Sequence, residues 1–315
     1  MFKRLSVLFL CVLLLSCTAC SSVNIQKNSK KVVIATTYSA YDWAKEIIGD
    51  TEEIEVKYLV DSAVDLHSYQ PSATDIIAYK EADLVIAIGG ESEEWLERLE
   101  LSEDKVINLI DCVDAREEEI IEGMQAEEDE EEAKEEGPEY DEHIWLSVKN
   151  AKRCVAKISD EFGILDPDNK ETYKKNSSDY IALLDNLDAE YEEAVNNSAN
   201  KVLLFGDRFP FRYMVEDYGL TYYAAFIGCS AESEASFETI IFLSGKIDEL
   251  GLKHVCVISD NHDIANTIID NTKDKDMDII EFNSLQSISN KEANNISYID
   301  VMTTNLEALK KALGD

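Results

Sequence analysis

Two of the four histidines in this 315-residue chain, His67 and His143, stand in surroundings that suit metal chemistry. His67 lies in the segment DLHSYQP at residues 65–71, and His143 lies in the segment YDEHIWL at residues 140–146. Carboxylates flank both imidazoles, and such neighbours orient an imidazole or act as hard ligands themselves. Imidazole nitrogen combined with carboxylate oxygen suits zinc, manganese or iron, so the pattern indicates a site for a divalent transition metal.

The other two histidines are weaker candidates. His254 precedes a predicted strand, which is the wrong end for a ligand in an open α/β sheet, so we expect it to be structural. His262 follows the same strand and remains an alternative ligand. No His-Glu-x-x-His segment or comparable constellation places a general base beside a metal, and we therefore do not expect an enzyme.

Short β-branched runs alternate with helical patterns along the chain, which is typical of α/β units around mainly parallel sheets. The predicted strands form two sets, at residues 32–35, 55–60, 84–88 and 105–109, and at residues 201–205, 222–226, 255–259 and 278–282. His67 follows one of them and should project from its carboxyl end, where open α/β sheets bind ligands.

Between the two sets, apolar residues recur at helical spacing from Asn169 to Asn196, after a start signal at Asp166-Pro167. At about 1.5 Å per residue, this helix would be on the order of 40 Å long, the length of a whole lobe. We therefore predict two Rossmann-like α/β lobes, residues 32–168 and 198–315, joined by one long backbone helix at residues 169–197.

The histidine motifs resemble those of the cluster A-I substrate-binding proteins, which serve bacterial zinc and manganese ABC importers. They are His-x-Tyr-x-Pro at His67 with Asp75-Ile76 beyond it, and His-x-Trp-Leu at His143 leading into Asn150-Ala151. Further matches are spread over the chain: Tyr173, Asn176, Tyr218-Gly219-Leu220, Met302, Asn305 and Leu306. The resemblance implies one zinc or manganese ion, carried as cargo between the lobes and passed to a permease. We expect a monomer without a catalytic cofactor.

The third ligand is where the chain departs from that family, whose zinc-binding members usually carry a histidine just after the first strand of the second lobe. Here the segment reads FGDRFPF at residues 205–211. Counting from the strand points to Asp207, whereas counting back from Tyr218 points to Arg208, which cannot bind a cation. Manganese-type members resemble the chain in carrying a carboxylate here, and we predict Asp207 as the third ligand. A helix cap or an ion pair with Arg208 is the alternative role for Asp207.

The fourth ligand is less defined. The family often has an acidic residue where this chain has Asn283, whose amide oxygen is a weak donor. Alternatives at the carboxyl ends of second-lobe strands are Glu232, Glu234 and Asp260. Nitrogen and oxygen ligands discriminate poorly between zinc and manganese, so the sequence does not select one of them.

The N-terminus predicts export and lipid anchoring. Lys3 and Arg4 precede an apolar run at residues 7–15 that is too short to span a bilayer. The run ends in LLSC, which resembles a bacterial lipobox. We therefore predict a signal peptide at residues 1–16, lipidation of Cys17 with Cys20 as the alternative, and a polar tether at residues 17–31. The protein would then be held at the outer face of the bacterial cell membrane.

The net charge of -36, from 65 acidic and 29 basic side chains, argues against nucleic acid or an anionic membrane surface as a partner. Fifteen carboxylates lie between Glu117 and Glu142, where we expect a disordered acidic loop that solubilises the protein or weakly collects cations. The four cysteines beyond the leader, Cys112, Cys154, Cys229 and Cys256, are expected to be free thiols, with one disulfide as the alternative.

Two other functions remain as alternatives at this stage. One is a binding protein for an organic chelate or small solute, for which the candidate cleft residues are Arg208, Arg212, Tyr222 and Tyr223. The other is a surface adhesin lipoprotein.

Overall fold

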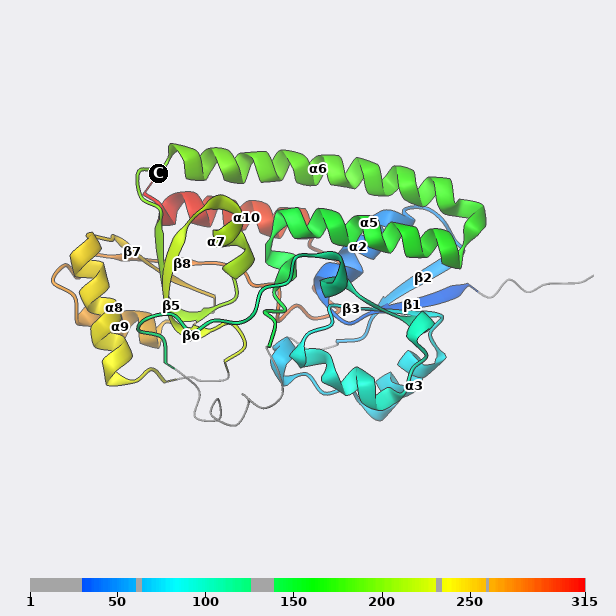
Figure 1. The fold of residues 1–315 in the computed structure, drawn as a ribbon, viewed down its shortest axis with the longest axis horizontal. Coiled ribbons are helices and arrows are strands. Elements are labelled where there is room, and N and C mark those ends of the chain that lie inside the picture. The colour runs from blue at the N-terminus through cyan, green and yellow to red at the C-terminus, as the bar shows by residue number, and fades with distance from the viewer. Residues whose placement is uncertain (1–29, 61–63, 126–138, 231–233, 259–260, 315) are drawn as a thin grey trace, which may run out of the picture. The chain divides into compact units, whose positions relative to one another are not determined.

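The computed structural model describes residues 30–60, 64–125, 139–230, 234–258 and 261–314, and the part from Lys31 onward contains two lobes, each built on a four-stranded parallel sheet (Figure 1). The predicted signal peptide and Cys17 and Cys20 lie outside the described residues. Among the described helices, none is both long and apolar enough to cross a membrane.

The first lobe contains the sheet β2-β1-β3-β4, formed by β1 (Lys31–Ala35), β2 (Ile54–Tyr58), β3 (Leu84–Ala87) and β4 (Val106–Asn108). All its strand pairs are parallel. The central strand β3 is wholly buried and β1 is buried from Val33 onward, because a parallel sheet is covered on both faces and needs continuous apolar runs. The α-helices between the strands are α2 (Tyr38–Ile48) and α3 (Ala73–Glu81). The 3₁₀ turns are η1 (Leu66–Ser68), η2 (Glu91–Leu99), η3 (Glu103–Lys105), η4 (Leu109–Cys112) and η5 (Ile144–Leu146).

The second lobe repeats the arrangement with the sheet β6-β5-β7-β8. Its strands are β5 (Val202–Phe209), β6 (Thr221–Ile227), β7 (His254–Val257) and β8 (Asp278–Glu281), and its helices are α7 (Arg212–Tyr218), α8 (Phe237–Leu250) and α9 (Asp263–Asp270). The register between β5 and β6 shifts between Phe205 and Arg208. Gly206 lies in this irregularity, where a Cβ would come within 2.8 Å of the Ala265 backbone.

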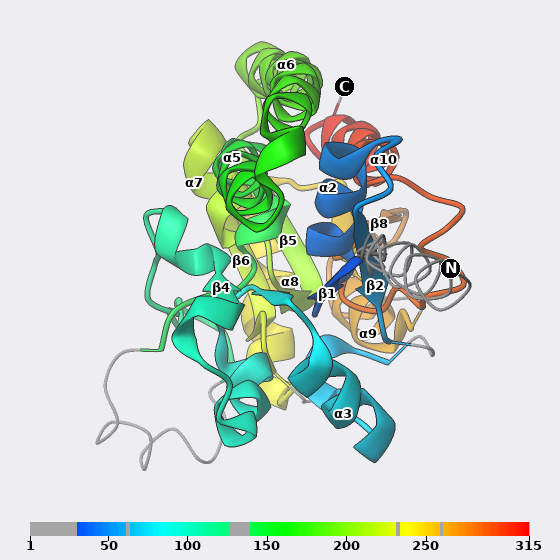
Figure 2. The same cartoon turned by 90° about the vertical axis from the view of Figure 1, so that its right-hand side faces the viewer.

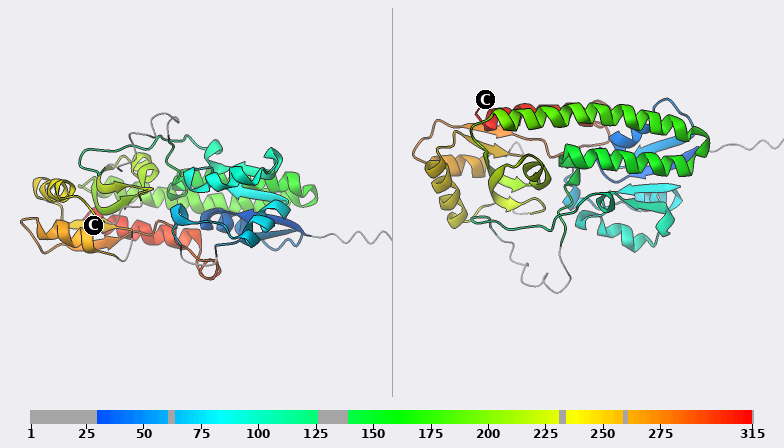
Figure 3. Two further views of the ribbon diagram at one scale, coloured as in Figure 1. Left: turned by 90° about the horizontal axis from the view of Figure 1, so that it is seen from below. Right: turned by 45° about the horizontal axis from the view of Figure 1, so that its top comes forward.

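Helix α6 (Lys170–Asn197) runs past both lobes and lies against α5 (Val148–Leu165), α2 and α10 (Tyr298–Ala312) (Figures 1 and 3). It follows the short turn η6 (Pro167–Asn169), as the Asp-Pro start signal predicted. Its apolar residues at helical spacing are buried on one face: Tyr173, Tyr180, Leu184, Leu187 and Tyr191. When the molecule is turned by 90° about the vertical axis, α6, α5 and α10 are seen together on one side of the strands (Figure 2).

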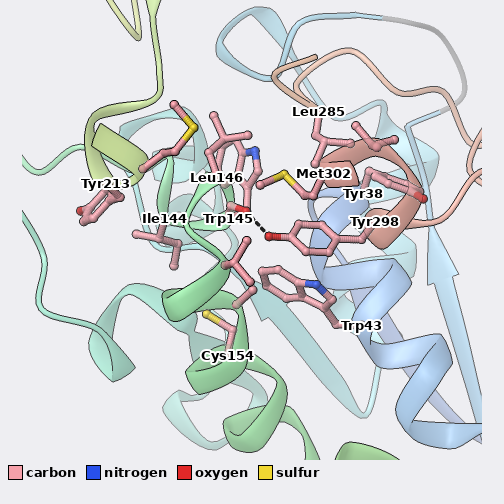
Figure 4. Packing of buried hydrophobic residues seen from close by; sticks show 14 of the residues in the cluster. Tyr38, Trp43, Ile144, Trp145, Leu146, Cys154, Tyr213, Leu285, Tyr298 and Met302 are labelled. Carbon is pink, nitrogen blue, oxygen red and sulfur yellow. Dashed lines mark hydrogen bonds between the residues drawn. The ribbon is translucent and has the colours of Figure 1, made fainter. Parts of the chain in front are cut away.

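The last helix contributes to the core beside η5, the turn that follows His143 (Figure 4). The Tyr298 hydroxyl donates to the Trp145 carbonyl at 2.6 Å, and the Trp145 indole N–H donates to the Ser284 carbonyl at 2.8 Å. The Trp43 ring packs edge-on against Tyr298 at 5.1 Å between centroids. These contacts fix the backbone next to His143 from several elements at once.

The predicted α/β class, the eight strands and the long helix are confirmed, with ends that differ by a few residues. The expected disordered loop at residues 117–142 is too wide. Its described ends form an antiparallel bridge between Glu117 and Tyr140 and contact the second lobe. For example, the Gln125 N–H donates to the Ala225 carbonyl at 2.9 Å, and the Tyr213 hydroxyl donates to the Asp141 carbonyl at 2.7 Å. The central residues 126–138 lie outside the described part of the chain.

Candidate metal centre

His67 and His143 converge, although 76 positions separate them in the sequence. Their Nε2 atoms are 3.3 Å apart, and His143 is completely buried. His67 lies in η1, where the Asp65 carboxylate accepts the His67 backbone N–H at 3.1 Å. His143 immediately precedes η5, and the Asp141 carboxylate accepts its backbone N–H at 2.8 Å. Each histidine is thus held by the aspartate two positions before it, which sets the direction of the turn.

The Nδ1 atom of each ring, which is the nitrogen not involved in the contact between the two histidines, also faces a carboxylate. His143 Nδ1 lies 2.9 Å from Asp141 Oδ1, and His67 Nδ1 lies 3.3 Å from Glu142 Oε1. The Asp141 contact places the imidazole proton of His143 on Nδ1, so that its lone pair is on Nε2. The Glu142 charge favours the same tautomer in His67, although no hydrogen bond joins the two groups. Both lone pairs are then directed to one point.

Gln286, in the loop after β8, fills that point from the second lobe. Its side-chain nitrogen lies 2.8 Å from His67 Nε2 and 2.9 Å from His143 Nε2, and the residue is 1% exposed. An amide NH₂ has two donors, one for each imidazole lone pair. The Gln286 amide nitrogen therefore occupies the position that a cation held by both imidazoles would take.

Four side chains gather closely enough to hold a metal ion: His67, Glu142, His143 and Cys229. One donor atom from each lies within 4.8 Å of the donor atoms of the other three. Cys229 comes from the loop after β6, so both lobes contribute. We call these four residues the donor group.

Electrostatics at the donor group follow from burial. Burial and the neighbouring His143 lower the pKa of His67 to about 3, which keeps its imidazole neutral and able to ligate. Burial alone would lower the pKa of His143, but the Asp141 carboxylate and its hydrogen bond raise it overall. Burial raises the pKa of Glu142, and burial together with the nearby Glu118 carboxylate raises the pKa of the Cys229 thiol. An added cation would offset the repulsion among these buried acidic groups.

Asp207, predicted as the third ligand, is not in the donor group. It lies at the irregularity in β5, and its two carboxylate oxygens accept the backbone N–H groups of Arg208 at 2.8 Å and Ile258 at 3.1 Å. The carboxylate therefore joins β5 to the end of β7. Arg208 instead crosses to the first lobe and pairs with Asp65 at 2.7 Å.

The other candidates also lie away from the donor group or outside the described residues. The Asn283 side-chain oxygen accepts the Leu285 N–H at 2.8 Å, and Glu234 is exposed. His262 pairs with Glu281 at 2.8 Å, and His254 begins β7. Glu232 and Asp260 fall in the parts of the chain that the structure does not describe.

Sequence reasoning missed Gln286 and read Cys229 as an ordinary thiol. A signal was available for both, since Cys229 and Gln286 follow the carboxyl ends of β6 and β8, the edge where α/β sheets bind ligands. Glu142 was noticed only as a carboxylate beside His143.

Comparisons with known proteins identify the family and the fold. The sequence model of the family described as "Zinc-uptake complex component A periplasmic" matches residues 33–312. The zinc-binding lipoprotein AdcA of Streptococcus pneumoniae is 29% identical over 315 residues, which cover 98% of this chain but only 61% of AdcA. The manganese ABC transporter substrate-binding lipoprotein PsaA of Streptococcus mitis is 28% identical over 98% of this chain and 97% of PsaA. The crystal structure of the Zn(II)-bound ZnuA-like domain of S. pneumoniae AdcA superposes with a TM-score of 0.70 at 26% identity, covering 91% of this chain and 100% of that one.

Proposed function

Because the chain belongs to the zinc-uptake complex component A family, we propose that it captures a divalent transition metal, zinc or manganese, between its two lobes and delivers it to the permease of an ABC importer. The observation that carries this proposal is the convergence of the two imidazole lone pairs. Two nitrogens bound at about 2.0–2.1 Å to one ion with a tetrahedral angle lie about 3.3 to 3.4 Å apart. The 3.3 Å between His67 Nε2 and His143 Nε2 matches that separation.

When the protein captures a metal, the ion would replace the Gln286 amide nitrogen between the two imidazoles. The amide nitrogen bridges both Nε2 atoms, so a metal can reach them only when this side chain withdraws. Since Gln286 belongs to the second lobe and both imidazoles to the first, loading couples the ion to the contact between the lobes. A change in the contact between the lobes would let a permease distinguish the loaded protein from the metal-free protein.

The chelate alternative is less well supported, because the arginines that an organic anion would need are already paired. Arg208 pairs with Asp65, and Arg212 pairs with Glu119 and Glu216.

The test is to replace His67 and His143 together by alanine and to measure metal binding by equilibrium titration with elemental analysis. We expect the wild type to bind one zinc or manganese ion and the double variant to bind none stoichiometrically, because two nitrogen ligands are lost. His262→Ala is the matched control, since this histidine pairs with Glu281 away from the donor group. Tight one-to-one binding by the double variant would refute the proposed site.

We also propose that lipidation of Cys17 holds the protein at the outer face of the membrane near its permease, in support of which the relatives AdcA and PsaA are named lipoproteins. Cys17→Ala should move the protein from the membrane fraction to the soluble fraction. Cys20→Ala should leave it at the membrane, and the opposite pattern would assign the anchor to Cys20.

A further inference from the structure

Resting on the proposed metal capture, we infer that Cys229 and Glu142 complete the ligand set with His67 and His143. The site then has two nitrogens, one sulfur and one oxygen, and it takes zinc in preference to manganese. The set differs from the one that the sequence predicted, because the second lobe supplies a thiol in place of the Asp207 carboxylate.

The backbone before Cys229 is shaped to bring this residue against the imidazoles. Gly228 lies so close to His143 that a Cβ would be 2.7 Å from its Cε1 atom and 3.0 Å from its Nδ1 atom. The same Cβ would meet the Pro210 backbone at 3.1 Å. Only a residue without a side chain allows the loop after β6 to approach this far, and the next residue in that loop is Cys229.

Glu142 offers a buried oxygen that accepts no hydrogen bond within the described residues. Its Oε2 atom accepts the Ser92 backbone N–H at 3.1 Å, which pins the carboxylate. Its Oε1 atom is buried and makes no hydrogen bond within the described residues, and it lies 3.3 Å from His67 Nδ1. The residue is 1% exposed. A buried carboxylate oxygen without a hydrogen bond is costly, and a bound cation would satisfy it.

The glycine before η2 supports the same placement. A Cβ on Gly90 would lie 1.9 Å from Glu142 Oε2 and 2.3 Å from its Cβ atom. The loop therefore closes directly over the Glu142 side chain, whose Oε1 atom lies beside His67. The first lobe thus presents three donors, and the second lobe adds the sulfur.

The chemistry of these donors distinguishes the two metals. Thiolate is a soft ligand that zinc accepts readily, and zinc is satisfied by four ligands in a tetrahedral arrangement. Manganese prefers oxygen ligands and usually six of them. Within the described residues the donor group has one carboxylate and one sulfur, and the Asp207 carboxylate is engaged by backbone amides. The set is therefore matched to zinc.

The decisive experiment uses Co²⁺ as a spectroscopic probe of the purified protein, together with competitive titrations of Zn²⁺ and Mn²⁺. A cobalt–thiolate bond produces a strong sulfur-to-metal charge-transfer absorption in the near ultraviolet. We expect this band in the wild type and in Cys112→Ser, a matched control because Cys112 is also a partly buried thiol. We expect it to be absent in Cys229→Ser.

The affinities supply the second readout. Cys229→Ser should bind Zn²⁺ about 100-fold more weakly while its Mn²⁺ affinity changes less than about threefold, because only the soft ligand is lost. Glu142→Gln should weaken Zn²⁺ about tenfold and keep the cobalt band. Thermal unfolding of the metal-free variants separates a lost ligand from a lost fold.

The outcomes separate this inference from the proposed function. A wild-type protein that binds one metal ion without the cobalt–thiolate band would overturn the role of Cys229 and leave metal capture intact, and this measurement requires no variant. An unchanged zinc affinity in Glu142→Gln would remove Glu142 from the set. A wild-type protein that binds neither ion would overturn both the inference and the proposed function.

Discussion

The candidate metal centre has two sides that are built differently: the first-lobe wall, formed by His67, His143 and Glu142, and the second-lobe wall, formed by Gln286 and Cys229. On the first-lobe wall, each imidazole is fixed by an aspartate two positions earlier, and a carboxylate also faces each Nδ1 atom. On the second-lobe wall, Gln286 and Cys229 lie in loops after strands, and the Gln286 amide must leave before a metal can enter. The difference teaches that the first lobe presets the two imidazoles, whereas, in the metal capture proposed above, the second lobe supplies the amide that the ion displaces and the sulfur that selects zinc.

The largest effect is expected from removing the support of the first-lobe wall. Asp141→Ala deletes the carboxylate that accepts both the backbone N–H and the ring Nδ1–H of His143. Loss of such an orienting group typically costs about 10–100-fold in metal affinity. Isothermal titration with Zn²⁺ measures the change.

Asp141→Asn is the control, because its amide oxygen still accepts a hydrogen bond and should recover much of the affinity. Full affinity in Asp141→Ala would mean that His143 needs no preset orientation, and the proposed contrast between the walls would be lost.

Two glycine substitutions compare the walls directly. The Cβ of Gly90→Ala would clash with Glu142 inside the first lobe, and the Cβ of Gly228→Ala would clash with His143 across the lobe boundary. A clash inside one lobe must distort packing, which costs about 1–3 kcal/mol of unfolding free energy. The closest clash of Gly228→Ala, with His143, lies between lobes and can be relieved by a small separation, whereas the 3.1 Å contact with the Pro210 backbone in the second lobe needs only a slight shift. Gly228→Ala should therefore lower zinc affinity about tenfold, an effect of about 1.4 kcal/mol on binding, while changing stability by less than about 1 kcal/mol.

Gly245→Ala serves as the reference for both, because a Cβ at this position in α8 meets nothing within 4 Å. Denaturant unfolding and zinc titration of the three variants give the pattern. Equal losses of stability in Gly90→Ala and Gly228→Ala would show that the second-lobe wall is as rigid as the first.

A smaller effect of opposite sign is expected at Gln286. Gln286→Ala removes an amide that competes with the metal for both imidazole lone pairs. A hydrogen bond contributes about 0.5–1.5 kcal/mol net, so the zinc affinity should rise several-fold. Weaker binding in an isothermal titration with Zn²⁺ would instead show that Gln286 turns its amide oxygen to the ion as a ligand.

Much of the fold was predictable from sequence because its signals are local. Apolar runs of strand length, helical spacing in α6 and the Asp-Pro start signal each report on a short stretch of chain. The two histidines were predictable for a similar reason, since the aspartate that holds the backbone of each one lies two positions before it. Gln286 and Cys229 follow strand ends, which places them at the ligand-binding edge of the sheet, but their contact with the histidines depends on the packing of the second lobe against the first. This packing is a long-range property that no short motif reports. The backbone hydrogen bonds of Asp207 were not predictable, because the irregularity in β5, which turns its carboxylate toward backbone amides, has no clear sequence signal beyond Gly206.

The last prediction concerns Asp207, where the sequence and the structure give opposite expectations. If Asp207 were a ligand, Asp207→Ala would weaken metal binding strongly and leave the metal-free fold unaffected. In the structure its carboxylate accepts the N–H groups of Arg208 and Ile258 and so ties β5 to the end of β7. Hydrogen bonds to a charged group contribute about 1.5–3 kcal/mol, reduced here because Asp207 is only partly buried. We therefore expect Asp207→Ala to lose about 1–2 kcal/mol of unfolding free energy and to change zinc affinity by less than about twofold. Asp207→Asn, which keeps one acceptor oxygen, should lose less stability. A large drop in affinity with full stability would return Asp207 to the ligand set and give the second lobe the hard oxygen that manganese prefers.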